Sequence, residues 1–219
     1  EDFTEYNTYV TDLDQYVTPC SSNLMVIAAR PSNGKSTFML YNAVQMALDG
    51  IKVVFVSLEM NKVQIKRKIL AWVLKQKIGP EDHDKMEKAM KDPKFKVIDE
   101  NLTLICNYSN NAPTIFNVMK DYINREDTEV FFIDYLQLMS YPKMDEWSSL
   151  RKVTFSLKKF TTEYNKLVIT SSQVSRSSED LGITMGSMFG SSSIESDADI
   201  LISISQGDKN RLTYDSEKI

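Results

Sequence analysis

One stretch, from Val26 to Thr37, constrains the fold of this chain more than any other. It is a short apolar run followed by a turn that ends in Gly-Lys-Ser-Thr. In a phosphate-binding loop, a buried strand leads into such a turn, and a helix follows whose N-terminal N–H groups and dipole face the phosphates. Lys35 can then give a cation to the phosphates, and the Ser36 hydroxyl can ligate Mg²⁺. The stretch therefore predicts an α/β fold with a site for a nucleotide.

The turn departs from the generic Gly-x-x-x-x-Gly-Lys-Ser/Thr pattern at one position. Ala29 stands where the first glycine is expected, so the pattern alone is incomplete and needs support from the rest of the chain. We take the whole turn with its flanks as candidate nucleotide-binding residues, namely Ala29, Arg30, Pro31, Ser32, Asn33, Gly34, Lys35, Ser36 and Thr37.

Short apolar runs alternate with helical patterns along the chain. The runs predict strands at residues 24–29, 53–56, 102–106, 130–133, 167–170 and 200–204, of which the fourth ends at Asp134 and the fifth at Ser172-Gln173. Apolar periodicity predicts helices over 36–48, 62–77 and 81–91, a helix capped by Asn111 or Thr114, and a helix with Val153, Leu157 and Phe160 on its apolar face. Residues 174–193 show no clear periodicity. This order predicts a mainly parallel sheet with helices on both faces.

Polar residues follow three of these strands, at the edge of the sheet where functional groups collect in such folds. Asp134 could hold Mg²⁺ or its waters together with Ser36. Glu59 is a candidate general base for the water that attacks a γ-phosphate, and Gln173 could sense that phosphate through its amide. Each has a structural alternative, as a loop residue, a capping carboxylate or a partner for loop backbone. The phosphate-loop pattern favours the functional interpretation of Asp134, whereas for Glu59 and Gln173 both interpretations stay open on the residues alone.

Composition limits the remaining classes of protein. With 219 residues and 42% hydrophobic content, we expect one domain over 24–219 after a lead-in segment, 1–23. There is neither an apolar run long enough to cross a bilayer nor a signal-peptide pattern, so we expect a soluble protein of the cytoplasm. Two distant cysteines and a single histidine, His83, argue against a disulfide framework or a zinc site.

A net charge of −4 argues against a surface that binds nucleic acid by bulk positive charge, but a local patch stays possible. We interpret the basic residues of 62–77 first as a solvated helix face, with a nucleic-acid patch as the alternative. Trp72 and Trp147 are interpreted as packing or subunit-contact residues in preference to base-stacking ones.

Several segments together resemble, in order, the motifs of the DnaB-type replicative helicase motor domain. They are residues 28–36, 55–60, 132–139, 172–173 and 193–199. The Ala-Arg-Pro-Ser start of the phosphate loop and the Ser-Leu-Glu-Met element are specific to that family among RecA-like ATPases, and the family accommodates an alanine where Ala29 stands. The resemblance extends from about Leu13 to about Ile204, and the compact inserts are similar to phage or plasmid versions, which work in the host-cell cytoplasm.

The resemblance implies a RecA-like fold in a hexameric ring, with ATP bound between neighbouring subunits and single-stranded DNA in the central channel. On that pattern Lys35 and Ser36 hold phosphates and Mg²⁺, Asp134 is the carboxylate on the metal side, Glu59 is the catalytic base, and Gln173 couples the γ-phosphate to DNA-binding loops. A primase or a helicase loader would be a further partner. The implied DNA-contact residues follow Gln173 and act largely through backbone N–H and hydroxyl groups; they are Arg176, Gly190, Ser191 and Ser192.

The family's arginine finger lies on a strand beyond the Asp-Ala-Asp element. Residues 209–211, Lys-Asn-Arg, are too close to the last expected strand to supply it. We therefore expect the chain to be a piece of a longer protein, with the finger beyond Ile219. Two alternatives stay open at this point: a RecA/RadA-like recombinase or clock-type ATPase, and a non-catalytic, nucleotide-gated assembly module.

Overall fold

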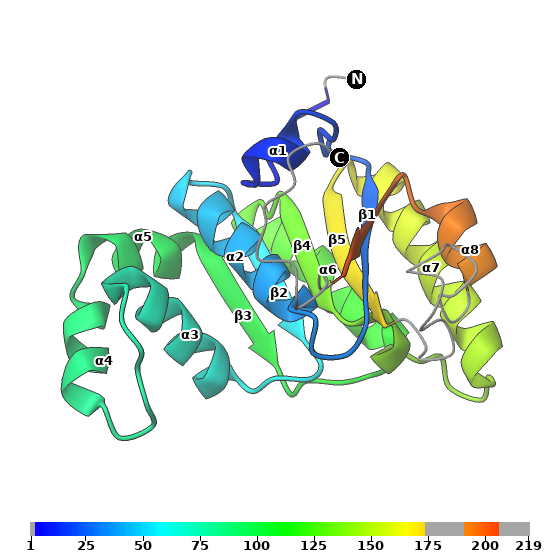
Figure 1. The fold of residues 1–219 in the computed structure, drawn as a ribbon. Coiled ribbons are helices and arrows are strands. Elements are labelled where there is room, and N and C mark those ends of the chain that lie inside the picture. Colours follow the sequence, from blue (N-terminus) through cyan, green and yellow to red (C-terminus); the bar gives the residue numbers. More distant parts are fainter. Residues whose placement is uncertain (1–2, 174–190, 206–219) are drawn as a thin grey trace.

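A computed structural model describes residues 3–173 and 191–205, and a parallel sheet runs through the middle of this part of the chain (Figure 1). The strand order is β3-β2-β4-β5-β1-β6, and every pair of neighbours is parallel. The strands are β1 (Leu24–Ala29), β2 (Val53–Ser57), β3 (Leu102–Cys106), β4 (Val130–Asp134), β5 (Leu167–Gln173) and β6 (Ile200–Ile204). The predicted mainly parallel sheet is confirmed.

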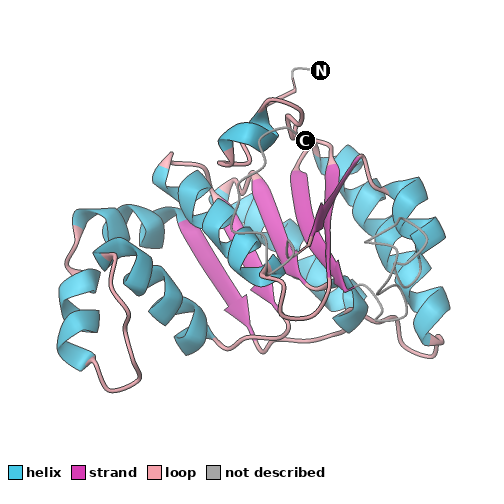
Figure 2. Ribbon diagram, viewed as in Figure 1, coloured by secondary structure: helices cyan, strands magenta, loops and turns pink. Residues whose placement is uncertain are grey.

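Helices cover both faces of the sheet (Figure 2). They are α1 (Thr11–Asp14), α2 (Lys35–Leu48), α3 (Lys62–Leu74), α4 (His83–Met90), α5 (Pro93–Asn101), α6 (Ala112–Glu126), the 3₁₀ turn η1 (Leu136–Leu138), α7 (Glu146–Tyr164) and α8 (Ser191–Asp197). None of the described helices is long and apolar enough to cross a membrane.

The core forms two apolar layers, one on each side of the sheet. Successive strand residues point to opposite faces, so Phe55 and Phe132 stack at 5.9 Å on the side of α2, α3 and α5. On the other side, Phe131 meets Phe160 of α7 edge to face at 5.7 Å, next to α6. Strands β1, β2 and β4 are buried on both faces and are apolar runs with no polar alternation before their last residue, as expected inside a parallel sheet.

The described part of the chain contains three α-helices, α1, α5 and α8, and the 3₁₀ turn η1 that the sequence patterns did not predict. Helix α5 begins at Pro93, and the Asp92 side chain caps it by accepting from Lys94 N at 2.8 Å. An Asp-Pro pair is a helix-start signal, so this helix could have been recognised. Helix α8 lies partly within the stretch that showed no periodicity. The predicted cap of α6 is Asn111, whose side chain accepts from Thr114 N at 3.1 Å.

The lead-in segment packs on the domain. Tyr6 is only 6% exposed and belongs to the apolar layer on the α2 side. Its backbone N–H donates to Pro19 O at 2.8 Å, which closes the segment into a loop against the domain.

Candidate nucleotide site

The phosphate loop joins β1 to α2 at the carboxyl edge of the sheet. Ala29 is the last residue of β1, fully buried and in register with Gln173 of β5 and Ile204 of β6. It is an ordinary strand residue without a positive φ, so nothing in its backbone requires glycine. The missing first glycine of the pattern is thereby explained.

The turn itself does require unusual backbone conformations. Ser32 has a φ of 65° and Gly34 a φ of 87°. A Cβ on Gly34 would meet nothing within 4 Å, so the positive φ, not crowding, is what favours glycine there. The turn, the start of α2 and neighbouring loops enclose a hollow of about 320 Å³, lined by Pro31, Ser32, Gly34, Lys35, Ser36, Thr37, Glu59, Met60, Lys68 and Gln173.

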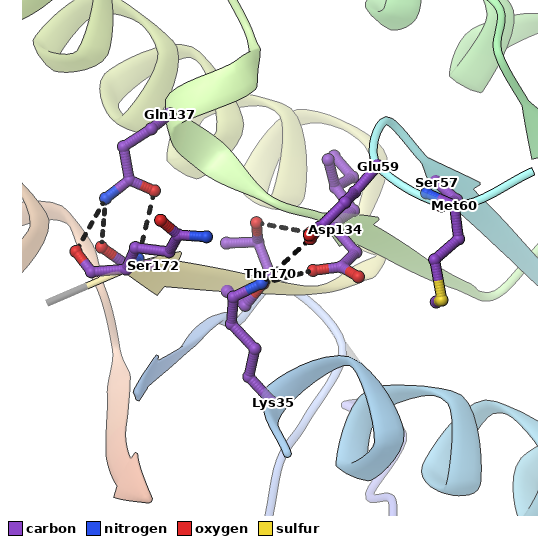
Figure 3. A network of polar contacts seen from close by, with 11 residues as sticks. Lys35, Ser57, Glu59, Met60, Asp134, Gln137, Thr170 and Ser172 are labelled. Carbon is purple, nitrogen blue, oxygen red and sulfur yellow. Dashed lines mark hydrogen bonds and ion pairs between the residues drawn. The ribbon is translucent and has the colours of Figure 1, made fainter. Parts of the chain in front are cut away.

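Lys35 is the centre of this site. Its side chain is almost fully buried, and its Nζ lies 3.4 Å from Glu59 Oε2 and 3.5 Å from Asp134 Oδ1 (Figure 3). The same Nζ lies 4.3 Å from the centre of the Tyr135 ring. Burial, together with the charges of Glu59 and Asp134, raises the pKa of Tyr135 above its ordinary value. Two carboxylates that were predicted separately from the sequence, Glu59 and Asp134, therefore meet at the ammonium group of Lys35.

Asp134 ends β4 and is completely buried. Its Oδ1 accepts from the Ser171 hydroxyl at 2.8 Å, and its backbone O accepts from Leu58 N at 2.9 Å. Its Oδ2 is buried and has no hydrogen-bond partner among the described residues. A buried, unpartnered carboxylate oxygen is costly unless a ligand satisfies it, and oxygen ligands are what Mg²⁺ prefers. The donor set therefore fits the predicted cation, with Ser36 half-buried in the first turn of α2.

Glu59 lies in the short connection between β2 and α3. The Ser57 hydroxyl accepts from Met60 N at 2.9 Å, which bends the chain across the glutamate. The Glu59 side chain is 50% exposed. It can therefore contact both Lys35 and solvent, as a base acting on water must.

Gln173 ends β5 and lines the hollow, and a second glutamine holds it there. Gln137 Nε2 donates to Ser172 Oγ at 2.8 Å and to Gln173 O at 3.1 Å, and Gln137 Oε1 accepts from Gln173 N at 3.2 Å (Figure 3). The register of β4 with β5 ends at Thr170, so β5 continues beyond its neighbour. The Gln137 amide takes the place that the β4 backbone would have filled.

Sequence reasoning missed two residues of the site. Gln137 lies within a quoted motif, but only the fold shows which strand it contacts. Lys68 lines the hollow from α3, although we had assigned the basic residues of this helix to a solvated face. Lys68 is half-buried, and its position on the hollow adds a contact with the nucleotide site that the sequence pattern did not indicate.

The implied DNA-contact residues are only partly described. Ser191 and Ser192 begin α8, whereas Arg176, Gly190 and residues 209–211 lie outside the described residues. The end of the Asp-Ala-Asp element has a structural role. Asp199 accepts from Lys158 Nζ at 2.7 Å and from Leu24 N at 2.7 Å, which ties α7 to the start of β1.

Comparison with known proteins agrees with this arrangement. Residues 6–218 match the family model of the DnaB-like helicase C-terminal domain. The chain is 29% identical over 197 residues to a probable plasmid replicative DNA helicase of Chlamydia psittaci, covering 85% of this chain and 43% of that protein. It is 30% identical over 219 residues to the replicative DNA helicase DnaB of Haemophilus influenzae, covering 92% and 46%.

Solved structures show the same similarity. One solved ATPase domain is 25% identical with a TM-score of 0.77, and the match covers 96% of this chain and 79% of that one. A solved DnaB-like replicative helicase has the same fold, with a TM-score of 0.73 at 24% identity over 90% of this chain and 50% of that one. The chain spans less than half the length of the two relatives above. The fold, the site and the family match lead to one conclusion: this chain belongs to the DnaB-like helicase C-terminal domain family.

Proposed function

We propose that this chain is the motor domain of a replicative DNA helicase, which hydrolyses ATP to move along single-stranded DNA and unwind duplex. The observation that carries the proposal is the position of Lys35 Nζ, 3.4 Å from Glu59 and 3.5 Å from Asp134 beside the phosphate loop. An ATP site needs a cation for the phosphates, a carboxylate for the metal and a base for water. The family match favours a helicase over a recombinase.

The residues would divide the work as follows. The backbone N–H groups of the turn and Lys35 bind the phosphates, while Ser36 and Asp134 hold Mg²⁺. The metal ion neutralises charge on the phosphate oxygens. Phosphate oxygens compete for Lys35 Nζ and so loosen its ion pair with Glu59. The Glu59 carboxylate is then available to accept a proton from the attacking water.

Gln173 would connect this chemistry to DNA. It lines the hollow and is followed at once in the sequence by residues 174–193, the segment to which the sequence assigns DNA contact. Loss of the γ-phosphate that moves Gln173 would therefore also move the DNA-binding segment, because the two are adjacent in the chain.

The whole protein would form a hexameric ring in the cytoplasm, with ATP between subunits. An arginine beyond Ile219 would reach the neighbouring site, and its loss would slow hydrolysis by ~10³-fold or more. The solved DnaB-like replicative helicase was described with its interactions with primase, and we propose a primase or a loader as a partner here.

Unwinding of forked DNA by the full-length protein tests the proposal. We expect Lys35→Ala to abolish ATP-dependent unwinding, because the phosphates lose their buried cation. Lys91→Ala removes an exposed lysine whose ion pair is with Glu87 of α4; it serves as the control and should unwind like the wild type. Unwinding that persists in Lys35→Ala would contradict the site. Formation of joint molecules without directional unwinding would instead identify a recombinase.

Turnover of ATP separates a motor from a nucleotide-gated assembly module. We expect Glu59→Gln to lower turnover about 10²- to 10⁴-fold, the usual contribution of a general base, both with and without single-stranded DNA. A full-length protein with no turnover, and no change in Glu59→Gln, would favour the module.

A further inference from the structure

One face of α7 points away from the sheet and carries large aromatic side chains. Trp147, Arg151, Phe155 and Lys159 follow one another at four-residue spacing, which places them on one side of the helix. Trp147 is 46% exposed and Phe155 is 61% exposed, so Trp147 does not have the packing role within the chain that we had considered. We call these four residues the α7 stripe.

Cations and aromatic rings are paired along the stripe and beside it. The Arg151 guanidinium lies 5.2 Å from the centre of the Trp147 ring, and Lys152 Nζ lies 4.3 Å from the centre of the Tyr141 ring. The Tyr141 hydroxyl is 2.9 Å from Ser156 Oγ, a hydrogen bond that orients its ring. Aromatic rings and positive charges therefore alternate on this surface.

Helices α7 and α8 pack side by side (Figure 1). Side chains of the stripe and of α8 line a hollow of about 590 Å³. Trp147, Arg151 and Phe155 line it from α7, and Ser196 and Asp197 line it from α8. Its volume is within the range of small-molecule sites. Helix α8 starts at Ser191, in the segment to which the sequence assigns DNA contact, so the hollow continues that predicted contact.

We propose that the α7 stripe and this hollow bind unpaired bases of single-stranded DNA. Aromatic rings offer stacking faces to bases of any sequence, and neighbouring cations attract the phosphates between them. Asp197 on the opposite wall repels phosphate but can accept hydrogen bonds from base amino groups. The chain has a net charge of −4, but the stripe carries the positive charges of Arg151 and Lys159. This local positive charge would attract the phosphates of single-stranded DNA to this face. The inference rests on the proposed function, and it adds base stacking to contacts through backbone and hydroxyl groups.

Two probes separate base stacking from binding to phosphates. We would measure the affinity of the full-length protein for fluorescent oligothymidine and for an abasic strand of the same length. Trp147→Ala and Phe155→Ala should each weaken oligothymidine binding about 5- to 100-fold, the range found for one lost stacking partner, and change abasic binding little. Trp147→Phe keeps an aromatic ring and should recover most of the affinity. Phe3→Ala is the matched control, because Phe3 is also 61% exposed and lies outside the stripe.

Several results would overturn the inference. Wild-type affinity of both alanine variants for oligothymidine would exclude stacking, and equal losses on both probes would leave only an electrostatic contact. Dissociation of the oligomer in these variants would show that this surface contacts a second copy of the chain instead of DNA. If the wild-type protein binds neither probe, the proposed function is contradicted as well. If the wild type binds and unwinds DNA and the alanine variants bind equally well, only this inference is contradicted.

Discussion

Replacing Gln137 with leucine is the sharpest test of how the nucleotide site is built. The Gln137 amide makes three hydrogen bonds to the end of β5, at 2.8, 3.1 and 3.2 Å. Leucine is similar in size but can make none of them. Ser172, which is fully buried, and the backbone of Gln173 would be left without these partners.

The magnitude follows from the number of bonds lost. A typical hydrogen bond contributes about 1 kcal/mol net, so the free energy of opening the end of β5 should fall by about 2–3 kcal/mol. That corresponds to amide exchange at Gln173 that is about 30- to 100-fold faster, since 1.4 kcal/mol is a factor of ten. Because a strand end can open locally, the melting temperature should change much less than this exchange rate.

Hydrogen–deuterium exchange of peptides that cover residues 167–173 measures the effect. Gln76→Leu makes the same substitution at an exposed position after α3 and should leave exchange in β5 as in the wild type. Exchange at Gln173 within twofold of wild type in Gln137→Leu would refute the reasoning. If the held end of β5 also carries the nucleotide signal, stimulation of ATP turnover by single-stranded DNA should be lost in the same variant.

Three further predictions follow from particular contacts. Burial raises the pKa of the Tyr6 hydroxyl from its ordinary 10.0 to about 12, so the unfolded chain loses this proton at lower pH than the folded chain. The free energy of unfolding should therefore fall by up to about 2–3 kcal/mol as pH rises from about 10 to about 12. In urea unfolding above pH ~10, Tyr6→Phe should show a smaller fall than the wild type. Asp199→Ala removes the acceptor shared by Leu24 N and Lys158 and should lower the free energy of unfolding in urea by about 1–3 kcal/mol; an unchanged free energy of unfolding would contradict this role. Lys68→Ala should weaken ATP binding about 3- to 10-fold by calorimetry, because the hollow loses a half-buried cation; unchanged affinity would remove Lys68 from the site.

Much of the fold could be predicted from local patterns. All six described strands were predicted, because β-branched and aromatic runs buried on both faces differ clearly from helical periodicity. The apolar run of β5 covers only residues 167–170, but its end was expected at Ser172-Gln173, and the strand does end at Gln173. Ser171 and Ser172 are polar, yet both are fully buried in this strand, and the Ser171 hydroxyl donates to Asp134, a contact that no local pattern could predict.

The candidate site was likewise predicted only in part. Lys35, Glu59, Asp134 and Gln173 were each identified from a motif or a strand end, and the prediction that they share one edge required only a parallel sheet. The role of Gln137 could not be predicted, because its partners lie 35 and 36 residues away.

By itself, then, the sequence determined the α/β class, the phosphate loop and the residue types at the strand ends, since these depend on neighbours within a few positions. Only the tertiary structure decided that β4 and β5 lie side by side, that Lys35 meets both carboxylates, and that α7 and α8 enclose a hollow beside an exposed aromatic stripe. Periodicity reports which face of an element is buried, whereas the order of the strands decides which buried faces and which strand ends become neighbours.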